Sequence, residues 1–223
     1  MSNNKLKVVI IDYGSGNLRS VVSAFEMAAR MGSINCDVVV TNKPDDVSDS
    51  NKIILPGVGN YFDCFKQLSS IPNMIDTLNY SVKIKLTHFL GICVGMQLLS
   101  SFSLEEKKTC GLNWIPGSVT KIPSSWNVRV PHIGWNLIKP INNHFLFPTT
   151  TSNNFNHSAY FIHSYIYKVL NPSNILASTS FYKDITVAVC NKNIIGVQFH
   201  PEKSHNFGIM FCKNFLLWSN KFE

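Results

Sequence analysis

The sequence predicts a flavodoxin-like α/β fold, in which helices flank an open mixed sheet. Two observations lead to this prediction. Short β-branched runs such as residues 7–12 (KVVIID) alternate with helix-like segments, which is typical of parallel strands buried on both faces. A later apolar run ends in Gly91-Ile92-Cys93-Val94-Gly95, the pattern of a strand, a sharp turn and a helix. The 223 residues fit one domain, 1–223.

Composition excludes several functional classes. The net charge is +7, but the lysines are spread along the chain instead of forming a basic stripe, so we expect no nucleic-acid partner. No apolar run approaches the roughly 18 residues that a membrane helix needs, and the N-terminus lacks a signal-peptide cleavage site, so we expect a cytoplasmic protein without a membrane partner. The six cysteines form no C-x-x-C pair, so we expect reduced thiols, no metal site and no cofactor.

The first half of the chain reads as repeated strand and helix units. Four strands are expected, at 7–12, 37–41, 52–55 and 86–90. Helices are expected from residue 17, with Leu18, Val21, Val22 and Phe25 buried, from Pro44, and over 61–85 with a break near Pro72. A glycine loop, Pro56-Gly57-Val58-Gly59, follows the third strand. Loops at the carboxyl ends of parallel strands meet in one crevice, so this loop and Cys93 are expected at the same edge.

The second half offers shorter strand-like pieces punctuated by turns. They are expected to extend the sheet in antiparallel or mixed fashion. The pieces are 118–122, 129–136, 159–167, 175–178, 187–190 and 194–200. Residues 142–157 are expected to form a surface loop, and a final helix over 205–220 is expected to bury Ile209, Phe211, Phe215 and Leu216.

Cys93 is a candidate nucleophile. A residue at a strained turn needs neighbours without side chains, which Gly91 and Gly95 supply. The turn is expected to open a helix that places Val94, Leu98 and Ser101 on one face, and a helix start favours the thiolate. The alternative is a buried cysteine in an ordinary strand and helix unit.

His200 is the candidate base. It ends an apolar run that Pro201 stops, and Glu202 follows two residues later. In an extended segment these two side chains lie on the same face, so the carboxylate can orient and charge the imidazole. A nucleophile, a base and an orienting carboxylate together suit acyl transfer. His132 and His163 are expected to be core or supporting histidines.

Three motifs together resemble the class I, triad-type glutamine amidotransferases. They are Gly91-Ile92-Cys93-Val94-Gly95-Met96-Gln97, Pro56-Gly57-Val58-Gly59 and His200-Pro201-Glu202. The resemblance implies the fold of that family and a Cys93, His200 and Glu202 triad that hydrolyses glutamine. It also implies an oxyanion hole at Val58, Gly59 and Val94, and glutamine binding at Gly57 and Gln97. Val94 stands where the family usually has leucine, which keeps the side chain apolar.

Further motifs resemble one branch of this family, the glutaminase subunits of imidazole glycerol phosphate synthases in histidine biosynthesis. They are the segments 12–17 (DYGSGN), 131–136 (PHIGWN), 160–165 (YFIHSY) and 200–204 (HPEKS). The resemblance implies a (β/α)8-barrel cyclase partner that receives the ammonia. The interface positions it implies are Asn17, Trp135, Tyr160 and Lys203.

Other functions remain open at this point. A paralogue with a similar barrel partner would supply ammonia for surface-sugar amination. Another Cys-His amidohydrolase would need Cys93 on its sharp turn and His200, but it would have no required role for Gln97. A binding module with a degenerate site would lack a member of the triad, whereas all three are present.

Overall fold

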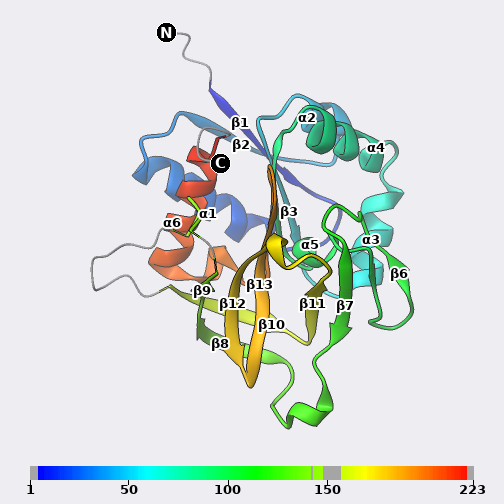
Figure 1. Ribbon diagram of the computed structural model, residues 1–223. Coiled ribbons are helices and arrows are strands. Elements are labelled where there is room, and N and C mark those ends of the chain that lie inside the picture. The colour runs from blue at the N-terminus through cyan, green and yellow to red at the C-terminus, as the bar shows by residue number, and fades with distance from the viewer. Residues whose placement is uncertain (1–4, 142, 148–156, 220–223) are drawn as a thin grey trace.

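The computed structural model describes residues 5–141, 143–147 and 157–219. Its centre is an eight-stranded sheet in the order β2-β1-β3-β4-β14-β13-β12-β9 (Figure 1). The strands from β2 to β14 in this order are parallel, and those from β14 to β9 are antiparallel. Their bounds are β1 Leu6–Ile11, β2 Cys36–Thr41, β3 Lys52–Gly57, β4 His88–Cys93, β9 Lys139–Pro140, β12 Ile175–Phe181, β13 Lys183–Asn191 and β14 Ile194–Val197.

Helices cover both faces of the parallel half. Figure 1 shows α1 and α6 side by side on one side of the sheet and α2, α3 and α4 on the other. The apolar residues of β1, β3 and β4 are therefore buried on both faces, and Val8, Ile53 and Phe89 are fully inaccessible. The bounds are α1 Leu18–Met31, α2 Pro44–Ser48, α3 Tyr61–Ser70, α4 Met74–Asn79, η1 Tyr80–Ile84, α5 Val94–Gln97 and α6 His205–Leu217. These features confirm the predicted mixed α/β sheet with flanking helices.

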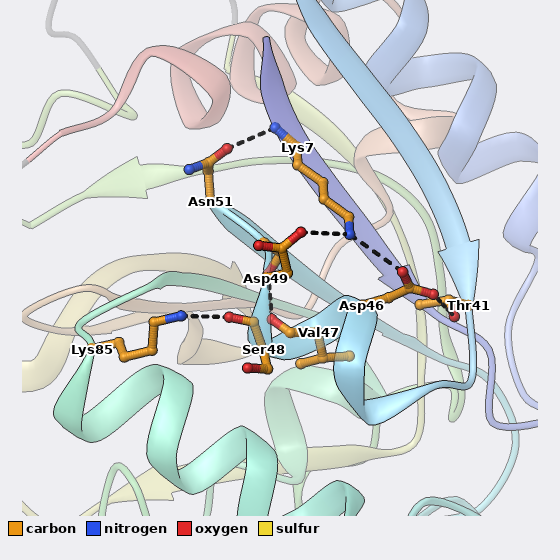
Figure 2. A network of polar contacts seen from close by, with 9 residues as sticks. Lys7, Thr41, Asp46, Val47, Ser48, Asp49, Asn51 and Lys85 are labelled. Carbon is orange, nitrogen blue, oxygen red and sulfur yellow. Dashed lines mark hydrogen bonds and ion pairs between the residues drawn. The ribbon is translucent and has the colours of Figure 1, made fainter. Parts of the chain in front are cut away.

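A polar network fastens α2 to the first two strands (Figure 2). Lys7 Nζ lies 3.3 Å from Asp46 Oδ1 and 3.2 Å from Asp49 Oδ2. The Thr41 hydroxyl donates to Asp46 Oδ2 at 2.8 Å. Asp49 is exposed, so these ion pairs contribute little stability beyond fixing the position of α2.

Within the described residues, two small sheets lie outside the main one. β8 (His132–Leu137) pairs with β10 (Ser158–His163), and β11 (Tyr165–Val169) pairs with β7 (Gly117–Lys121). β7 continues to β5 (Phe102–Ser103) and β6 (Thr109–Cys110). The predicted extension of the main sheet is thus right for β12 to β14 and wrong for these strands. The single strand expected over 159–167 is two strands, because the chain changes partner at Ser164.

The helices also differ from expectation at their ends. The helix after Cys93 stops at Gln97, well before Ser101, because the Leu98 and Leu99 carbonyls accept the N–H groups of Leu112 and Trp114. The last helix ends at Leu217, after which Trp218 is extended. Short 3-10 turns, η2, η3 and η4, span Ser124–Trp126, Pro172–Asn174 and Pro201–Lys203.

The expected surface loop at 142–157 is wrong in its described part. Leu146 and Phe147 are fully buried there, and Phe147 packs on Phe211 of α6. Residues 142 and 148–156 lie outside the described residues. In the chain segments that the structure describes, every helix is too short or too polar to cross a membrane.

Candidate active site

Cys93 stands at the sharp turn between β4 and α5. Its φ and ψ are 56° and −111°, a strained combination for a residue with a side chain. Glycine is required on both sides of it. A Cβ on Gly95 would lie 1.9 Å from the Leu55 carbonyl oxygen, and one on Gly91 would lie 2.4 Å from the Gly95 oxygen. The strand and turn expected around Cys93 are therefore present.

His200 follows β14, the strand beside β4 in the sheet, and its side chain pairs with Glu202. Nδ1 of His200 lies 2.8 Å from Oε1 of Glu202, and both side chains are 4% exposed. Pro201–Lys203 is a 3-10 turn, so the two side chains meet through a turn instead of the extended geometry expected from the sequence.

The electrostatics of His200 depend on Cys93 and Glu202. Burial alone would lower the pKa of His200, but its interactions with the Cys93 and Glu202 side chains raise it to about 10. Nε2 of His200 is buried and makes no hydrogen bond to any described residue. That atom is therefore available for proton transfer at the site.

The glycine loop after β3 is held by the loop after β1. The Tyr13 hydroxyl donates to the Pro56 carbonyl at 2.7 Å. The Ser15 hydroxyl donates to the Val58 carbonyl at 2.6 Å, and its oxygen lies 3.0 Å from the Val58 nitrogen, which donates to it. In this arrangement the Val58 N–H is already occupied. Gly59 has a φ of 107°, a value that favours glycine.

A cavity of about 310 Å³ opens over Cys93. It is lined by Val58, Gly59, Cys93, Val94, Gln97, Glu105, Pro131, Ile162, His163, Ser164, Tyr165, His200 and Lys203. Most of the expected site residues thus meet there, from elements far apart in the sequence. Gly57 and Glu202 do not line this cavity: Gly57 packs against Gly95 and Tyr13, and Glu202 contacts His200.

Two residues that the sequence analysis missed lie at the site. Glu105 accepts the Tyr61 N–H at 2.7 Å, and burial raises the pKa of its carboxyl. Gln198 is 1% exposed, and its amide contacts both Gln97 and the Cys93 sulfur. Gln198 stands two residues before His200, and this spacing in an extended run was the one available signal that both could face the same side. Glu105 comes from a connection with no such signal.

The two supporting histidines form a chain beside the cavity. His132 Nδ1 lies 3.0 Å from His163 Nε2, and His163 Nδ1 lies 2.8 Å from the Tyr165 carbonyl oxygen. Burial lowers the pKa of each imidazole to about 4, so both are neutral near pH 7. They fix the wall of the cavity and carry no charge.

Of the four expected interface residues, Lys203 lines the cavity, and all four are at least partly exposed. Trp135 is 48% exposed and stacks on His205 at 4.8 Å between ring centroids. Its ring lies 5.9 Å from Tyr160, which Lys203 Nζ also approaches at 5.9 Å. Asn17 is exposed and caps α1 by accepting the Ser20 N–H. The Trp135 side chain is thus half-exposed.

Comparison with known proteins decides the family. The model of the family "Glutamine amidotransferase class-I" matches residues 9–217. The chain is 45% identical over 214 residues to imidazole glycerol phosphate synthase subunit HisH of Brucella melitensis biotype 1, covering 96% of this chain and 99% of that protein. The corresponding subunit of Agrobacterium fabrum is 44% identical with the same coverage. The chain belongs to the HisH family of class I glutamine amidotransferases.

A solved structure supports the fold of this HisH-family chain. A crystal structure described as a glutamine amidotransferase matches with a TM-score of 0.67 over 94% of this chain and 97% of its own. The two sequences are 17% identical, so the likeness concerns the fold alone. The class I glutamine amidotransferase fold expected from the three motifs is confirmed for this HisH-family chain.

Proposed function

We propose that this chain is a glutaminase subunit that hydrolyses glutamine to glutamate and passes the ammonia to a (β/α)8-barrel synthase subunit. The product of the pair would be imidazole glycerol phosphate, with AICAR, in histidine biosynthesis. One arrangement carries the proposal: Cys93 and His200 line the same cavity, and His200 is paired with Glu202. It occurs in a chain that is 45% identical to a HisH subunit.

The proposed reaction has two halves. The Cys93 thiolate attacks the side-chain amide carbon of glutamine, and the protonated His200 gives its Nε2 proton to the nitrogen as the C–N bond breaks and ammonia leaves. Water then attacks the thioester, and His200 takes a proton from it. The C–S bond breaks, which releases glutamate, sends its carboxyl proton to solvent, and restores the Cys93 thiolate and the protonated His200. Glu202 orients His200 and stabilises its charged form.

Backbone N–H groups stabilise the tetrahedral oxyanion in this proposal. Val94 begins α5 directly after Cys93, so its N–H is free of the helix ladder. Val58 and Gly59 line the cavity opposite and would supply the second donor. The Val58 N–H now donates to Ser15, so the loop must rearrange before that group can serve. Gln97 would hold the bound glutamine, whereas the expected contact at Gly57 is not retained, because Gly57 packs against Gly95 and Tyr13 outside the cavity.

The outer face of the β8 and β10 pair is the proposed docking surface for the barrel. Alternate residues expose large apolar side chains there: Ile133, Trp135, Leu137 and Ile162 are each at least 40% exposed. Tyr160 lies between them, and its carbonyl accepts the His200 N–H at 3.0 Å. The surface is therefore joined directly to the catalytic base through β10, and Lys203 borders it beside Tyr160. Asn17, at the start of α1, is the other expected interface position. Ammonia released at Cys93 would have a short route to a partner placed here.

The other functions weighed from the sequence are less well supported. The alignments with the two HisH relatives include 99% of each relative's length, and both relatives are named as subunits of imidazole glycerol phosphate synthase. This favours histidine biosynthesis over surface-sugar amination. Gln97 faces the cavity, a role that an unrelated Cys-His amidohydrolase does not require. We place the protein in the cytoplasm, where this pathway would operate.

Glutamate release in three mixtures tests the proposal: the chain alone, with the barrel subunit from its own genome, and with that subunit and its nucleotide ligand. The proposal expects turnover to rise when the partner is added and further with the ligand. Trp135→Ala should weaken the complex by about 2 kcal/mol, roughly thirtyfold in Kd. Leu170→Ala is the matched control, because Leu170 is 77% exposed but lies outside the docking surface. Equal turnover in all three mixtures contradicts the coupling to a partner.

A further inference from the structure

The side chain of Gln198 bridges the nucleophile and Gln97. Its Nε2 donates to Cys93 Sγ at 3.6 Å, and its Oε1 accepts from Gln97 Nε2 at 2.9 Å. Gln198 and Gln97 are 1% and 4% exposed, so each amide depends on the other for its hydrogen bonds. The sequence motifs assigned no role to Gln198.

We propose that Gln198 is a positioning residue that holds the Cys93 sulfur and fixes which end of the Gln97 amide faces the substrate. This inference rests on the proposed glutaminase function. Gln198 lies between the two groups and does not line the cavity, so it acts through them.

The Cys93 sulfur determines which end of the Gln198 amide faces Cys93 and which end faces Gln97. A thiolate has no proton and only accepts hydrogen bonds, so it selects the Nε2 end of Gln198. The Oε1 end must then face Gln97 and accept from its Nε2. This leaves Gln97 Oε1 as the group presented to the cavity, where it is an acceptor for an N–H group of bound glutamine. The charge state of Cys93 and the polarity of the substrate contact are therefore linked.

Burial makes both contacts of Gln198 important. A hydrogen bond to a charged group is stronger than a neutral one, and more so away from water. Loss of the Gln198 amide removes a donor from Cys93 and also leaves the buried Gln97 Nε2 without its acceptor. The effect of a substitution should therefore appear in both the reactivity of Cys93 and the affinity for glutamine.

Two variants separate these contacts, with the chain assayed in complex with its barrel subunit. Gln198→Leu removes both the donor and the acceptor. Gln198→Glu keeps an acceptor for Gln97 but loses the donor and adds a negative charge beside the sulfur. The first readout is the rate at which iodoacetamide alkylates Cys93 across pH, followed on the Cys93 peptide by mass spectrometry. The second is kcat and KM for glutamine.

For Gln198→Leu we expect alkylation at pH 7 and kcat to fall about ten- to a hundredfold, and KM to rise severalfold. For Gln198→Glu we expect at least the same loss in alkylation and kcat, with KM within about twofold of the wild type because Gln97 keeps its acceptor. An alkylation profile of Gln198→Leu that matches the wild type overturns the inference. So does a rise in KM that is equal in both variants.

Asn193→Leu is the matched control. Asn193 precedes β14 at the end away from His200, is 4% exposed, and donates to the carbonyls of Val82 and Thr87 at 2.9 and 2.8 Å. We expect this variant to unfold at a lower temperature with the wild-type alkylation profile. If the alkylation profile of Asn193→Leu changes as much as that of Gln198→Leu, the inference is overturned. The loss of any buried amide would then be enough to change the reactivity of Cys93. If the wild type releases no glutamate, the proposed function fails, while the alkylation profiles still decide the role of Gln198.

Discussion

The Ser15 side chain binds both backbone polar groups of Val58, since its oxygen accepts the Val58 N–H at 3.0 Å and its hydroxyl donates to the Val58 carbonyl at 2.6 Å. A proposed oxyanion donor is thereby kept from the cavity. Ser15→Ala removes this acceptor, so the Val58 peptide can turn more easily. We expect the chain without its partner to hydrolyse glutamine several times faster, which a glutamate-release assay measures.

Ser69→Ala is the control for this comparison, because Ser69 is exposed on α3 and bonds only the Lys66 carbonyl among the described residues. Its basal turnover should equal that of the wild type. A basal rate that falls in Ser15→Ala would show that Ser15 supports the active loop and does not restrain it.

Glu202→Gln should lower activity by weakening the charged form of His200. The hydrogen bond between Nδ1 and Oε1 is 2.8 Å, and loss of a bond to a charged group corresponds to about a ten- to hundredfold loss in rate. We expect this loss in kcat for glutamine hydrolysis with the barrel partner present. An unchanged kcat would show that Glu202 does not assist the base.

The same variant changes how stability depends on pH. The pKa of His200 is raised to about 10 from 6.5, so the folded state holds this proton more tightly than the unfolded state does. The resulting stability is fully present below pH 6.5 and is lost as pH rises towards 10. Urea unfolding across pH should therefore show a smaller decline in Glu202→Gln than in the wild type over this window.

Lys52 contributes a pH dependence of the opposite sign. It is 3% exposed at the start of β3, donates to the Trp218 carbonyl and lies 5.2 Å from the Phe215 ring centre. Burial lowers its pKa from 10.5 to about 7, so the unfolded state binds the proton more tightly. Stability from this group rises as pH increases from about 7 to 10.5.

Lys52→Met should remove that rise while retaining the apolar packing of the side chain. We expect urea unfolding at pH 7 to show a variant as stable as the wild type or more so, since a buried charge is costly. The difference between the two proteins should shrink as pH approaches 10. A variant that is less stable by the same amount at every pH would contradict a titrating Lys52.

Gly95→Ala should damage the turn that carries Cys93. The new Cβ would lie 1.9 Å from the Leu55 carbonyl oxygen, so the backbone would have to shift, at a cost of about 3 kcal/mol or more in unfolding free energy. Gly59→Ala is the comparison, because its Cβ would meet no atom of the described residues within 4 Å and the cost comes from the φ of 107° alone, about 1 kcal/mol. Urea unfolding of both measures the difference, and equal losses would contradict the close approach at Gly95.

The sequence was sufficient to predict the parallel half of the fold and the edge of the sheet at which several of the proposed site residues meet. Buried strands such as β1 and β3 contain short runs of valine or isoleucine, and the loops at their carboxyl ends meet at one edge because of the topology of an open sheet. Cys93, Gln97 and His200 therefore meet at the cavity as expected. Gly91 and Gly95 were enough to predict the turn at Cys93, because backbone atoms occupy the places where a Cβ of either residue would lie.

The second half of the chain was less predictable because its strands pair with strands that are distant in the sequence. Residues 159–167 form one apolar run, yet β10 pairs with β8 and β11 pairs with β7. The helix after Cys93 is cut short by backbone hydrogen bonds from Leu112 and Trp114, which no local pattern reveals. Gln198 and Glu105 were missed for a related reason, since their roles depend on contacts with Gln97 and Tyr61 that only the tertiary fold creates.

Glutamate release by Cys93→Ala, in complex with the barrel subunit and its nucleotide ligand, tests the proposed chemistry most directly. Cys110→Ala is the control, because Cys110 is an exposed free cysteine on β6. We predict that Cys93→Ala binds the partner normally and releases no glutamate above the uncatalysed background, while Cys110→Ala turns over at the wild-type rate. Undiminished glutamate release by Cys93→Ala would contradict a Cys93 nucleophile.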